Sequence, residues 1–528
     1  MDIQPARDGV KETNQQRGPW ADNALEKPPP TCAIESELDP ANHTTVKSKG
    51  LYALLSLLEI ETHGIEPITD ERRTDPRLYE FFFVWFSTNI NVLAFSTGSV
   101  GPAFFGLGLR DSILVILVVD SMSLIIPAYF SVFGPKLGTR SMVQSRFSWG
   151  YYGSLIPSIL NVISMECYLI LNSIIGGQTL ASVSEQVSWS AGIIIISLIS
   201  FLVAFCGYRV VHWYERVAWI PNVVAFLVML GVNGQYIVHK QGSTTPTVAA
   251  ILSFASTTAA TDTGWCTIVA DYGVYHKSDT SSMRIFIFSY LGFFLSSFAA
   301  HALGAAFAAS SPYVAAWDTG FQHGNDIGGL LGAVLSPAGN FGKMLVILVA
   351  LTIPSTSAPT MYSFGTSFMN ISPGLAKVPR SVYAVVSTAI LIPLAIVGAR
   401  HFYSTFVDLA NIIGYWTGSF AGIIAVEHFV YRKNSFSKYN ITDWATARHL
   451  PMGAAAVLAF AGSIGIMVPC MSQVWYVGPI ARAGTGDIGI FVGLLSSGLL
   501  YLVFRPMELM VRRDVSAGER DRLGHINP

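Results

Sequence analysis

Charge is scarce in this sequence of 528 residues. Only 12% of the residues are charged and 51% are hydrophobic, whereas a soluble domain carries about a quarter charged residues. The formal net charge is −1, so the basic surface that nucleic-acid binding requires is missing. We therefore expect a protein that lives in the lipid bilayer and has no nucleic-acid partner.

Cysteine is scarce as well, and its spacing excludes the usual metal sites. The five cysteines form no C-x-x-C pair; they are Cys32, Cys167, Cys206, Cys266 and Cys470. No phosphate-binding loop and no nucleophile–base pair stands out, and His301 and His323 are isolated. The sequence therefore predicts no enzyme, no cofactor and no metal site.

Long hydrophobic runs are missing from the start of the chain. Residues 1–75 are polar and rich in proline and charge, and no basic segment is followed by the apolar segment of a cleaved signal peptide. We predict a disordered cytoplasmic tail over residues 1–75. The weakly amphipathic stretch from Leu51 to Gly64 fits either a helix on the membrane surface or a short solvated helix.

Beyond this tail, hydrophobic runs follow one another almost to the end of the chain. A helix needs about 20 apolar residues to cross the hydrocarbon core of a bilayer. That length predicts twelve spans, near residues 80–104, 111–134, 155–181, 190–207, 214–238, 247–271, 284–310, 343–369, 380–399, 404–428, 450–471 and 487–505. Residues 506–528 then form a short cytoplasmic C-terminal tail.

Lysine and arginine concentrate in alternate loops between these spans. The loops after even-numbered spans carry most of them, whereas the opposite loops carry single charges such as Arg110 and Lys240. Positively charged short loops stay in the cytoplasm. Both termini are therefore predicted to be cytoplasmic, while the oligomeric state is left open.

Two of the predicted spans are interrupted by polar residues and glycine. Span one contains NINVLAFSTGSVGPAF (Asn89 to Phe104), with Gly98, Gly101 and Pro102 in its second half, and span six contains STTAATDTGWCTIVADY (Ser256 to Tyr272). Unwound backbone is tolerated at membrane depth only where it lines a protein cavity. The alternative is that glycine and proline merely kink packed helices.

The two interrupted spans lie five spans apart, as a five-plus-five inverted repeat would place them. The predicted fold is therefore an all-α membrane protein with discontinuous helices 1 and 6. Its repeats cover residues 76–240 and 241–430, and two extra helices cover residues 431–505. In such folds the substrate binds between the broken helices, and we expect Trp265 of span six to stack on a flat substrate.

Spans three and eight add polar side chains with helical spacing. Tyr168 and Asn172 share one helix face, and so do Thr356 and Thr360. Asn172 either reads the edge of a heterocycle or bonds a neighbouring helix. The span-eight hydroxyls either satisfy backbone groups freed by Pro354 and Pro359 or bind the substrate.

Ionisable residues inside spans are costly and are functional candidates by default; they are Asp120, Glu166, Asp262, Asp271 and Glu427. Glu166 lies within a turn of Tyr168, and it is the candidate for carrying a coupling proton. A sodium ion would instead use span-one carbonyls and span-eight hydroxyls such as Ser357 or Thr356. Asp120, Asp271 and Glu427 fit structural contacts as well.

Several ordered motifs resemble the fungal purine–cytosine permeases of the nucleobase–cation symporter family. They include VGPAFFGLGLRDS (Val100 to Ser112), NSIIGGQ (Asn172 to Gln178), YRVVHWYERVAWIPN (Tyr208 to Asn222) and PTMYSFGTSF (Pro359 to Phe368). The resemblance implies a plasma-membrane carrier that imports a planar nitrogen base, usually with a proton. It also implies that the base lies between aromatic residues of spans three and six, with Trp265 and Asn172 on family positions.

Three departures from the family pattern bear on the substrate. Tyr168 stands where tryptophan is usual, Thr356 and Thr360 replace asparagines around Pro359, and Leu93 and Ala94 replace small polar residues. A hydroxyl cannot make the paired donor–acceptor contact of a carboxamide. The alternative substrates are therefore a non-nucleobase heterocycle such as pyridoxine or a specialised metabolite.

The predicted site thus has two groups of residues. The expected substrate-binding residues are Trp265, Tyr168, Asn172, Thr356, Thr360, Gly264 and Ser96, and the expected ion-coupling residues are Glu166 and Ser357. A major-facilitator carrier would need a long central loop, which is missing between spans six and seven. A sensor that no longer transports is the other rival, although both tails are too short for a large signalling domain.

Overall fold

The structure is a computed structural model that describes residues 64–205, 208–237 and 245–524. The chain divides into two units, residues 1–54 and 55–528, and every described residue belongs to the second unit. Most of the predicted N-terminal tail, including the amphipathic stretch up to residue 63, lies outside the described residues.

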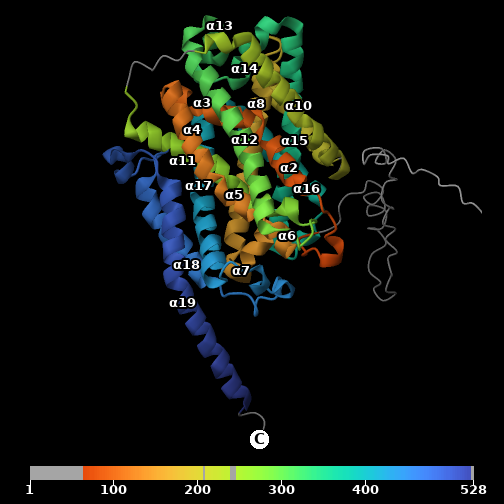
Figure 1. Ribbon diagram of the computed structural model, residues 1–528, viewed down its shortest axis with the longest axis vertical. Coiled ribbons are helices and arrows are strands. Elements are labelled where there is room, and N and C mark those ends of the chain that lie inside the picture. The colour runs from red at the N-terminus through yellow and green to blue at the C-terminus, as the bar shows by residue number, and fades with distance from the viewer. Residues whose placement is uncertain (1–63, 206–207, 238–244, 525–528) are drawn as a thin grey trace, which may run out of the picture. The chain divides into compact units, whose positions relative to one another are not determined.

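The regular structure in the described residues is helical (Figure 1), apart from two isolated β-bridges. The α-helices are α2 (Tyr79–Asn89), α3 (Val92–Ala103), α4 (Leu109–Ser123), α5 (Ile125–Phe130), α6 (Phe133–Leu137), α7 (Ser141–Gly153), α8 (Leu155–Ala181), α9 (Trp189–Phe205), α10 (Tyr208–Asn233), α11 (Val248–Gly264), α12 (Ser282–Ser310), α13 (Ala315–Phe321), α14 (Ile327–Leu335), α15 (Gly339–Ile371), α16 (Arg380–Gly398), α17 (Phe402–Val426), α18 (Ala454–Met467) and α19 (Gly489–Gly524).

Seven helical stretches in the described part of the chain are long and apolar enough to cross a membrane. They are Leu109–Leu137, Leu155–Ala181, Val217–Tyr236, Ser282–Tyr313, Ile327–Ile371, Arg380–Tyr431 and Gly489–Arg512. Trp189–Phe205 and Ala454–Cys470 are shorter apolar helices. The predicted all-helical membrane protein is therefore confirmed.

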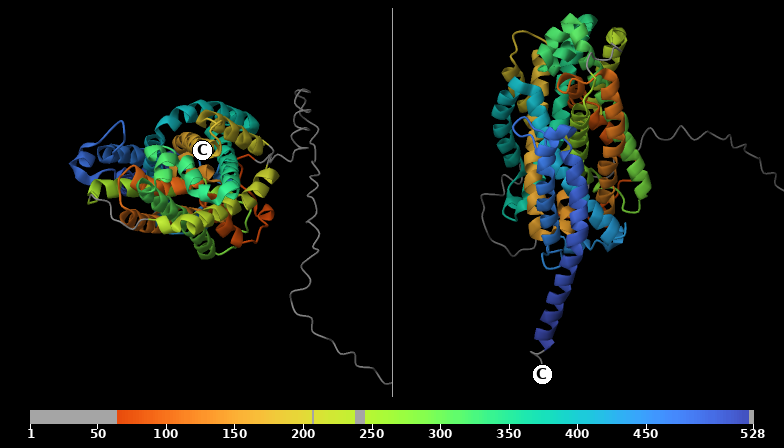
Figure 2. Two further views of the ribbon diagram at one scale, coloured as in Figure 1. Left: turned by 90° about the horizontal axis from the view of Figure 1, so that it is seen from above. Right: turned by 90° about the vertical axis from the view of Figure 1, so that its left-hand side faces the viewer.

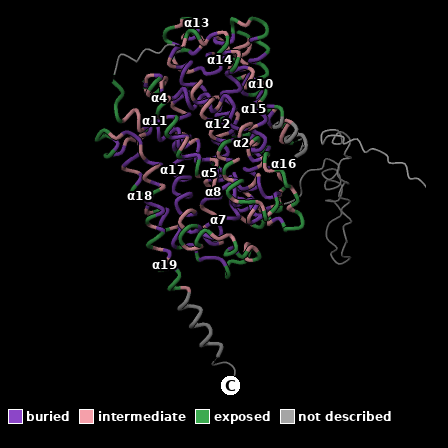
Figure 3. The backbone as a smooth tube through the Cα atoms, viewed as in Figure 1, coloured by how far each residue is buried: buried purple, intermediate pink, exposed green. Residues whose placement is uncertain are grey.

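Polarity is distributed as a lipid solvent requires. On α4, the outward residues Leu114, Val118 and Met122 are 50%, 56% and 68% exposed, whereas Asp120 on the same helix is fully buried. Figure 3 shows buried backbone concentrated inside the bundle and exposed backbone mainly along its outer faces and ends. Apolar side chains can face outward because lipid tails are as apolar as they are, while polar groups must find partners inside.

The first discontinuous helix is α2–α3. α2 ends at Asn89, Ile90 leaves the helical region, and Asn91 is extended at φ −139° and ψ 175° before α3 begins. Asn91 caps α3, because its side-chain oxygen accepts a hydrogen bond from the backbone N–H of Ala94 at 2.8 Å. The two half-helices therefore meet at Ile90–Asn91.

This position corrects the predicted break, which we placed near Gly98, Gly101 and Pro102. Gly98 and Gly101 lie inside α3 and serve close packing. A Cβ on Gly98 would collide with the backbone of His301 in α12, and a Cβ on Gly101 would lie 2.8 Å from the ring of Phe254. Glycine therefore marks helix contact here, and the asparagines mark the break.

The second discontinuous helix follows α11, where the sequence predicted it. α11 ends at Gly264, a 3-10 turn covers Trp265–Thr267, Ile268 has φ −133°, and a second 3-10 turn covers Val269–Gly273. In the packing, α12 lies against α3, α15 lies against α8, and α4 lies against α11. Figure 1 shows these helices within one bundle.

The two ends of the described chain differ from the predicted tails. Ile65 and Ile68 are buried, and Arg73 Nη1 donates to the carbonyl of Pro135 at 2.7 Å, so the last residues of the predicted disordered tail are ordered. At the other end, α19 continues to Gly524 through the predicted C-terminal tail. Figure 2 shows its last turns running past the other helices.

Candidate substrate-binding site

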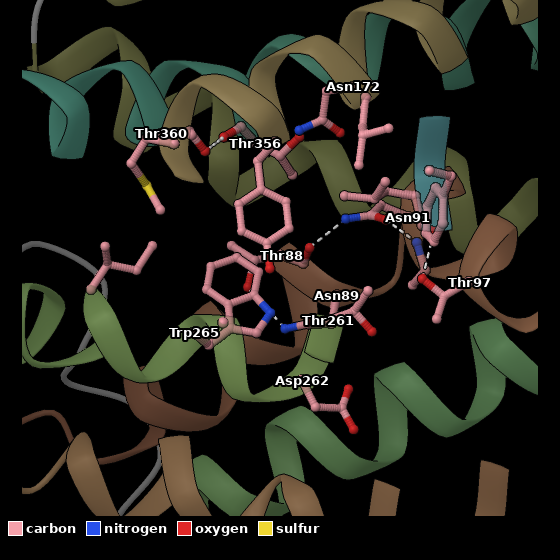
Figure 4. A pocket seen from close by; sticks show the side chains of 18 of the residues that line it. Thr88, Asn89, Asn91, Thr97, Asn172, Thr261, Asp262, Trp265, Thr356 and Thr360 are labelled. Carbon is pink, nitrogen blue, oxygen red and sulfur yellow. Dashed lines mark hydrogen bonds between the residues drawn. The ribbon is translucent and has the colours of Figure 1, made fainter. Parts of the chain in front are cut away.

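A pocket opens where the two broken helices meet. Its non-atom space is about 720 Å³, including the part open to solvent. Its lining comes from α2, α3, α8, α11, α12, α15 and α17 and from both breaks, and Figure 4 shows most of these side chains. The lining residues are Thr88, Asn89, Asn91, Leu93, Ala94, Thr97, Met165, Tyr168, Leu171, Asn172, Thr261, Asp262, Gly264, Trp265, Ile268, His301, Thr356, Thr360 and Phe406.

Trp265 supplies an aromatic wall of this pocket. Its backbone lies directly after α11, so the indole leaves the chain where the helix unwinds. The ring meets Trp85 of α2 edge-on, with centroids 5.7 Å apart, and Phe293 of α12 with centroids 6.1 Å apart. Trp85 in turn stacks on Phe293 at 4.6 Å. These contacts fix the indole on the α2–α12 side of the pocket.

Tyr168 of α8 approaches the same break, and Gly264 makes this approach feasible. A Cβ on Gly264 would overlap the Tyr168 hydroxyl and lie 3.2 Å from Cζ of that ring. The sequence named both residues, and both line the pocket. Any larger residue at position 264 would displace the tyrosine.

Among the residues of α8 that line the pocket, two have a buried polar atom without a hydrogen-bond partner in the described structure. The two atoms are Oη of Tyr168 and Oδ1 of Asn172. Buried polar groups are nearly always hydrogen-bonded, and each exception needs an explanation. Because the two groups lie one helical turn apart on one face, they form a polar edge that a bound solute can satisfy.

Thr356 and Thr360 line the pocket, and each hydroxyl already donates its proton to a backbone carbonyl. Thr356 Oγ1 donates to the carbonyl of Ile353 at 3.0 Å, and Thr360 Oγ1 donates to that of Thr356 at 2.7 Å. Both residues sit in α15 beside Pro354 and Pro359, so they stabilise a proline-containing helix. Their remaining lone pairs still accept hydrogen bonds from a solute. The structural interpretation of these hydroxyls is therefore confirmed, and substrate binding stays a prediction.

Three predicted site residues do not line the pocket. Ser96 is fully buried and donates to the carbonyl of Val92 at 2.8 Å. Glu166 accepts a hydrogen bond from Ser387 of α16 at 2.7 Å, and Ser357 Oγ is buried with no partner in the described structure. The structure thus brings six of the predicted residues together, namely Trp265, Tyr168, Asn172, Thr356, Thr360 and Gly264.

The sequence interpretation missed the polar residues at the first break. Asn91 Nδ2 donates to the carbonyl of Thr88 at 2.5 Å, and Asn89 Nδ2 donates to that of Trp85 at 3.0 Å. These bonds satisfy carbonyls at the end of α2, while Asn91 also caps α3. An asparagine directly before an apolar run is a helix-start signal, and NIN carried it. We assigned the break to Gly98 and Gly101 instead.

His301 was also missed as a pocket residue, and Asp262 was named only as an ionisable candidate inside a span. His301 Nδ1 lies 3.0 Å from Oδ2 of Asp120, and Ser123 Oγ donates to Oδ2 of Asp262 at 2.5 Å. One ligand atom from each of Asp120, Asp262 and His301 lies within 4.8 Å of the other two. Their separation in the sequence, on three different helices, hid this cluster.

A second group of possible metal ligands lies away from the pocket. Asp75, Glu80 and His276 each offer one ligand atom within 4.8 Å of the others. His276 Nε2 is 3.8 Å from Oε2 of Glu80, and burial lowers the pKa of His276 in spite of the nearby Asp75 carboxylate. The imidazole is therefore neutral at pH 7, and the group fits a local contact between the start of α2 and the segment after α11.

Comparison with known proteins identifies the family. A family profile described as permease for cytosine/purines, uracil, thiamine and allantoin matches residues 67–478. The chain belongs to the purine–cytosine permease family. The purine–cytosine permease fcyB of Emericella nidulans is 33% identical over 500 residues, covering 92% of this chain and 97% of the relative. The predicted resemblance is confirmed, and the chain is a membrane transporter rather than an enzyme.

Two further similar proteins extend the comparison. The vitamin B6 transporter TPN1 of Saccharomyces cerevisiae is 27% identical over 511 residues, covering 85% of this chain and 88% of the relative. Mhp1, a nucleobase–cation-symport-1 family transporter solved in a closed conformation with bromovinylhydantoin bound, superimposes with a TM-score of 0.63. That match is 16% identical and covers 85% of this chain and 96% of Mhp1, so it establishes the fold.

Proposed function

We propose that this permease is a secondary active transporter that imports a planar nitrogen heterocycle of the nucleobase type across the plasma membrane together with a proton. Its membership of the purine–cytosine permease family supports transport of this substrate class. In this proposal α2–α10 and α11–α17 form two inverted repeats, and α18 and α19 are additional helices. Both termini lie in the cytoplasm, as the distribution of lysine and arginine indicates.

The observation that carries the proposal is the polar edge of α8 opposite the indole of Trp265. Tyr168 Oη and Asn172 Oδ1 are buried in the pocket wall without partners. A flat ring that hydrogen-bonds along its rim would give Tyr168 Oη and Asn172 Oδ1 the partners that they lack. The same ring would stack on Trp265, and base–aromatic stacking contributes about 1–3 kcal/mol per ring. Alternating access then follows when one repeat rocks against the other around the bound ring.

The hydroxyls of α15 shape the choice of ring. Thr356 and Thr360 donate to backbone carbonyls, so they offer a solute acceptors only. A nucleobase edge that alternates donor and acceptor would leave at least one acceptor unpaired opposite these threonines. Each unpaired group costs about 1–3 kcal/mol of binding free energy. The pocket therefore favours a ring whose facing edge carries N–H or O–H donors.

A pyridine such as pyridoxine is the second candidate substrate. It carries hydroxyl donors around a flat nitrogen ring and thus fits acceptor-only threonines. A relative named as a vitamin B6 transporter, 27% identical to this chain, supports the same alternative. A sensor that binds the ring without moving it is the remaining rival.

The coupling ion in this proposal is a proton rather than sodium. A sodium site would use oxygen atoms such as Ser357 Oγ, which is buried without a partner in the described structure. A proton needs a titratable group, and Glu166, Asp262 and His301 are buried candidates inside the membrane. Uptake that rises with external acidity and ignores external sodium is the expected behaviour.

The test is an uptake screen in cells that lack their own permeases of this family. Radiolabelled adenine, cytosine, uracil, allantoin and pyridoxine are offered at two external pH values, with and without sodium. Saturable, pH-dependent uptake of at least one of these rings supports the proposal. If none enters, although surface labelling places the protein in the plasma membrane, the transport proposal is overturned and the sensor takes its place.

A further inference from the structure

Three ionisable side chains on three helices meet inside the membrane-spanning part of this permease. Asp120 of α4, Asp262 of α11 and His301 of α12 are 0%, 3% and 2% exposed. His301 Nδ1 lies 3.2 Å and 3.0 Å from the two carboxylate oxygens of Asp120. Buried charges are retained inside a membrane only where they pair or function. Asp120 and His301 pair with each other, whereas the burial of Asp262 remains to be explained.

The cluster is continuous with the substrate pocket. Asp262 and His301 line the pocket, whereas Asp120 lies behind His301. Figure 4 shows the Asp262 carboxylate near the unwound segment that begins at Trp265. On the other side, Gly98 of α3 packs directly on the backbone of His301. The cluster therefore contacts one half of each broken helix, so its charge state can bear on how these halves move.

The charge of the cluster changes with a single proton. With Asp120 and Asp262 ionised and His301 protonated, its net charge is −1, and one further proton makes it neutral. The ionisable neighbours in the described part of the chain are few: Tyr168 of α8 interacts electrostatically with Asp262, and Tyr290 of α12 with Asp120.

Farther along α11, Asp487, which lies just before α19, accepts hydrogen bonds from Tyr415 of α17 and from Ser256, six positions before Asp262. That group lies about 9 Å away along the helix. None of these neighbours supplies a positive charge to the cluster. An uncompensated negative charge out of water is costly, so a second proton on the cluster removes that cost.

We propose that the Asp120–His301–Asp262 cluster carries the coupling proton of this transporter, with Asp262 as the group that gains and loses it. This inference rests on the proposed proton symport. When the pocket opens outward, a proton from water forms an O–H bond at the Asp262 carboxylate and the cluster becomes neutral. When the pocket opens inward, that O–H bond breaks and the proton leaves to water. Asp120 holds His301 as an imidazolium in both states.

Glu166 is the rival carrier, and its surroundings differ. Its carboxylate accepts from Ser387 of α16, and the residue does not line the pocket. A metal ion is the other rival, because the three side chains offer ligands within 4.8 Å. His301 Nδ1 and Asp120 Oδ2 lie 3.0 Å apart and hydrogen-bond with each other rather than with a metal ion. This contact favours a proton over a metal ion as the coupling ion.

The test uses the purified full-length chain in liposomes, with radiolabelled cytosine and radiolabelled pyridoxine as probes. With pH about 7 inside, pH about 6 outside and no membrane potential, one proton per substrate supports about tenfold accumulation. The wild type is expected to approach that ratio. Asp120→Asn removes the carboxylate that holds His301 as an imidazolium. Asp262 then has no positive charge beside it when it ionises, so it is expected to keep its proton in both states. The variant is expected to accumulate the probe no more than about 1-fold while retaining exchange of labelled for unlabelled probe.

Controls separate coupling from folding and binding. Glu166→Gln is expected to keep the wild-type accumulation ratio. If Asp120→Asn does not fold, Asp262→Asn replaces it, with accumulation scored relative to its own exchange rate. The inference is overturned if Asp120→Asn still accumulates the probe about tenfold, if Glu166→Gln alone loses accumulation, or if a sodium or divalent-ion gradient drives the wild type. A wild type that moves neither probe overturns the proposed function, and this inference with it.

Discussion

At the residue scale, the site depends on one missing side chain. Gly264 ends α11, and the Tyr168 hydroxyl occupies the space where a Cβ would lie. The glycine therefore does more than loosen the helix, because it allows a residue of the first half of the chain to touch the break in the second half. That contact holds the phenol beside the indole of Trp265.

We predict that Gly264→Ala abolishes saturable uptake, since the new methyl group displaces the Tyr168 ring. Tyr168→Phe in the same chain removes the hydroxyl and leaves Cζ 3.2 Å from the added Cβ, a contact that small shifts relieve. The double variant is thus expected to recover part of the uptake that the single variant loses. Equal loss in both, at equal surface abundance, would show that the phenol does not occupy this position.

The sequence predicted the aromatic and span-eight residues of the site, but not all of its polar ones. Trp265 and Asn172 carried the family pattern, and helical spacing placed Tyr168 beside Asn172. His301 and Asp262 could not be paired in advance, because nothing in the sequence says which faces of α11 and α12 meet. The break at Asn91 could have been predicted, because asparagine before an apolar run is typical of a helix cap. We assigned the break to the glycines instead.

At the scale of helices, glycine sets how closely α3 and α12 approach. Gly98 faces the backbone of His301, and Gly304 of α12 faces the carbonyl of Phe95 in α3. Backbone cannot move aside as a flexible side chain can, so these two positions tolerate no larger residue. The contact fixes the half-helix that begins at Asn91 against the helix that carries His301.

We predict that Gly98→Ala destabilises the protein by about 1–3 kcal/mol, the usual cost of overpacking. Gly231→Ala is the matched control, since a Cβ on Gly231 meets nothing within 4 Å in α10, and it should be neutral or stabilise by up to about 1 kcal/mol. Thermal unfolding of the two purified variants in detergent measures the difference. A stable Gly98→Ala protein would mean that α3 and α12 lie farther apart.

At the scale of the whole molecule, hydropathy located the helices, and the orientation that charge predicts for them is part of the proposal. Each predicted span coincides with helix in the described residues, because apolar length is a local property that the sequence carries directly. The position of the first break was misplaced by several residues, because it depends on which glycines pack against a neighbour. Which glycines pack against a neighbouring helix depends on the tertiary structure, and the sequence of a single span does not show it.

The proposed topology gives a further prediction. Epitope tags at either end of the chain should bind antibody only after the plasma membrane is permeabilised, since an even number of spans with positively charged inner loops leaves both termini in the cytoplasm. A tag placed after Ser311, between α12 and α13, is expected to bind antibody on intact cells. Surface staining of either terminus on intact cells would require a different span count.

The central claim is that a flat ring rests on the indole of Trp265 between the two broken helices. Equilibrium binding of the best-transported ring to purified protein tests it most directly, with Trp475→Ala as the control because Trp475 is 64% exposed and lies outside the pocket. Loss of about 1–3 kcal/mol of stacking predicts at least about tenfold weaker binding in Trp265→Ala and unchanged binding in Trp475→Ala. Wild-type affinity in a folded Trp265→Ala protein would contradict the account.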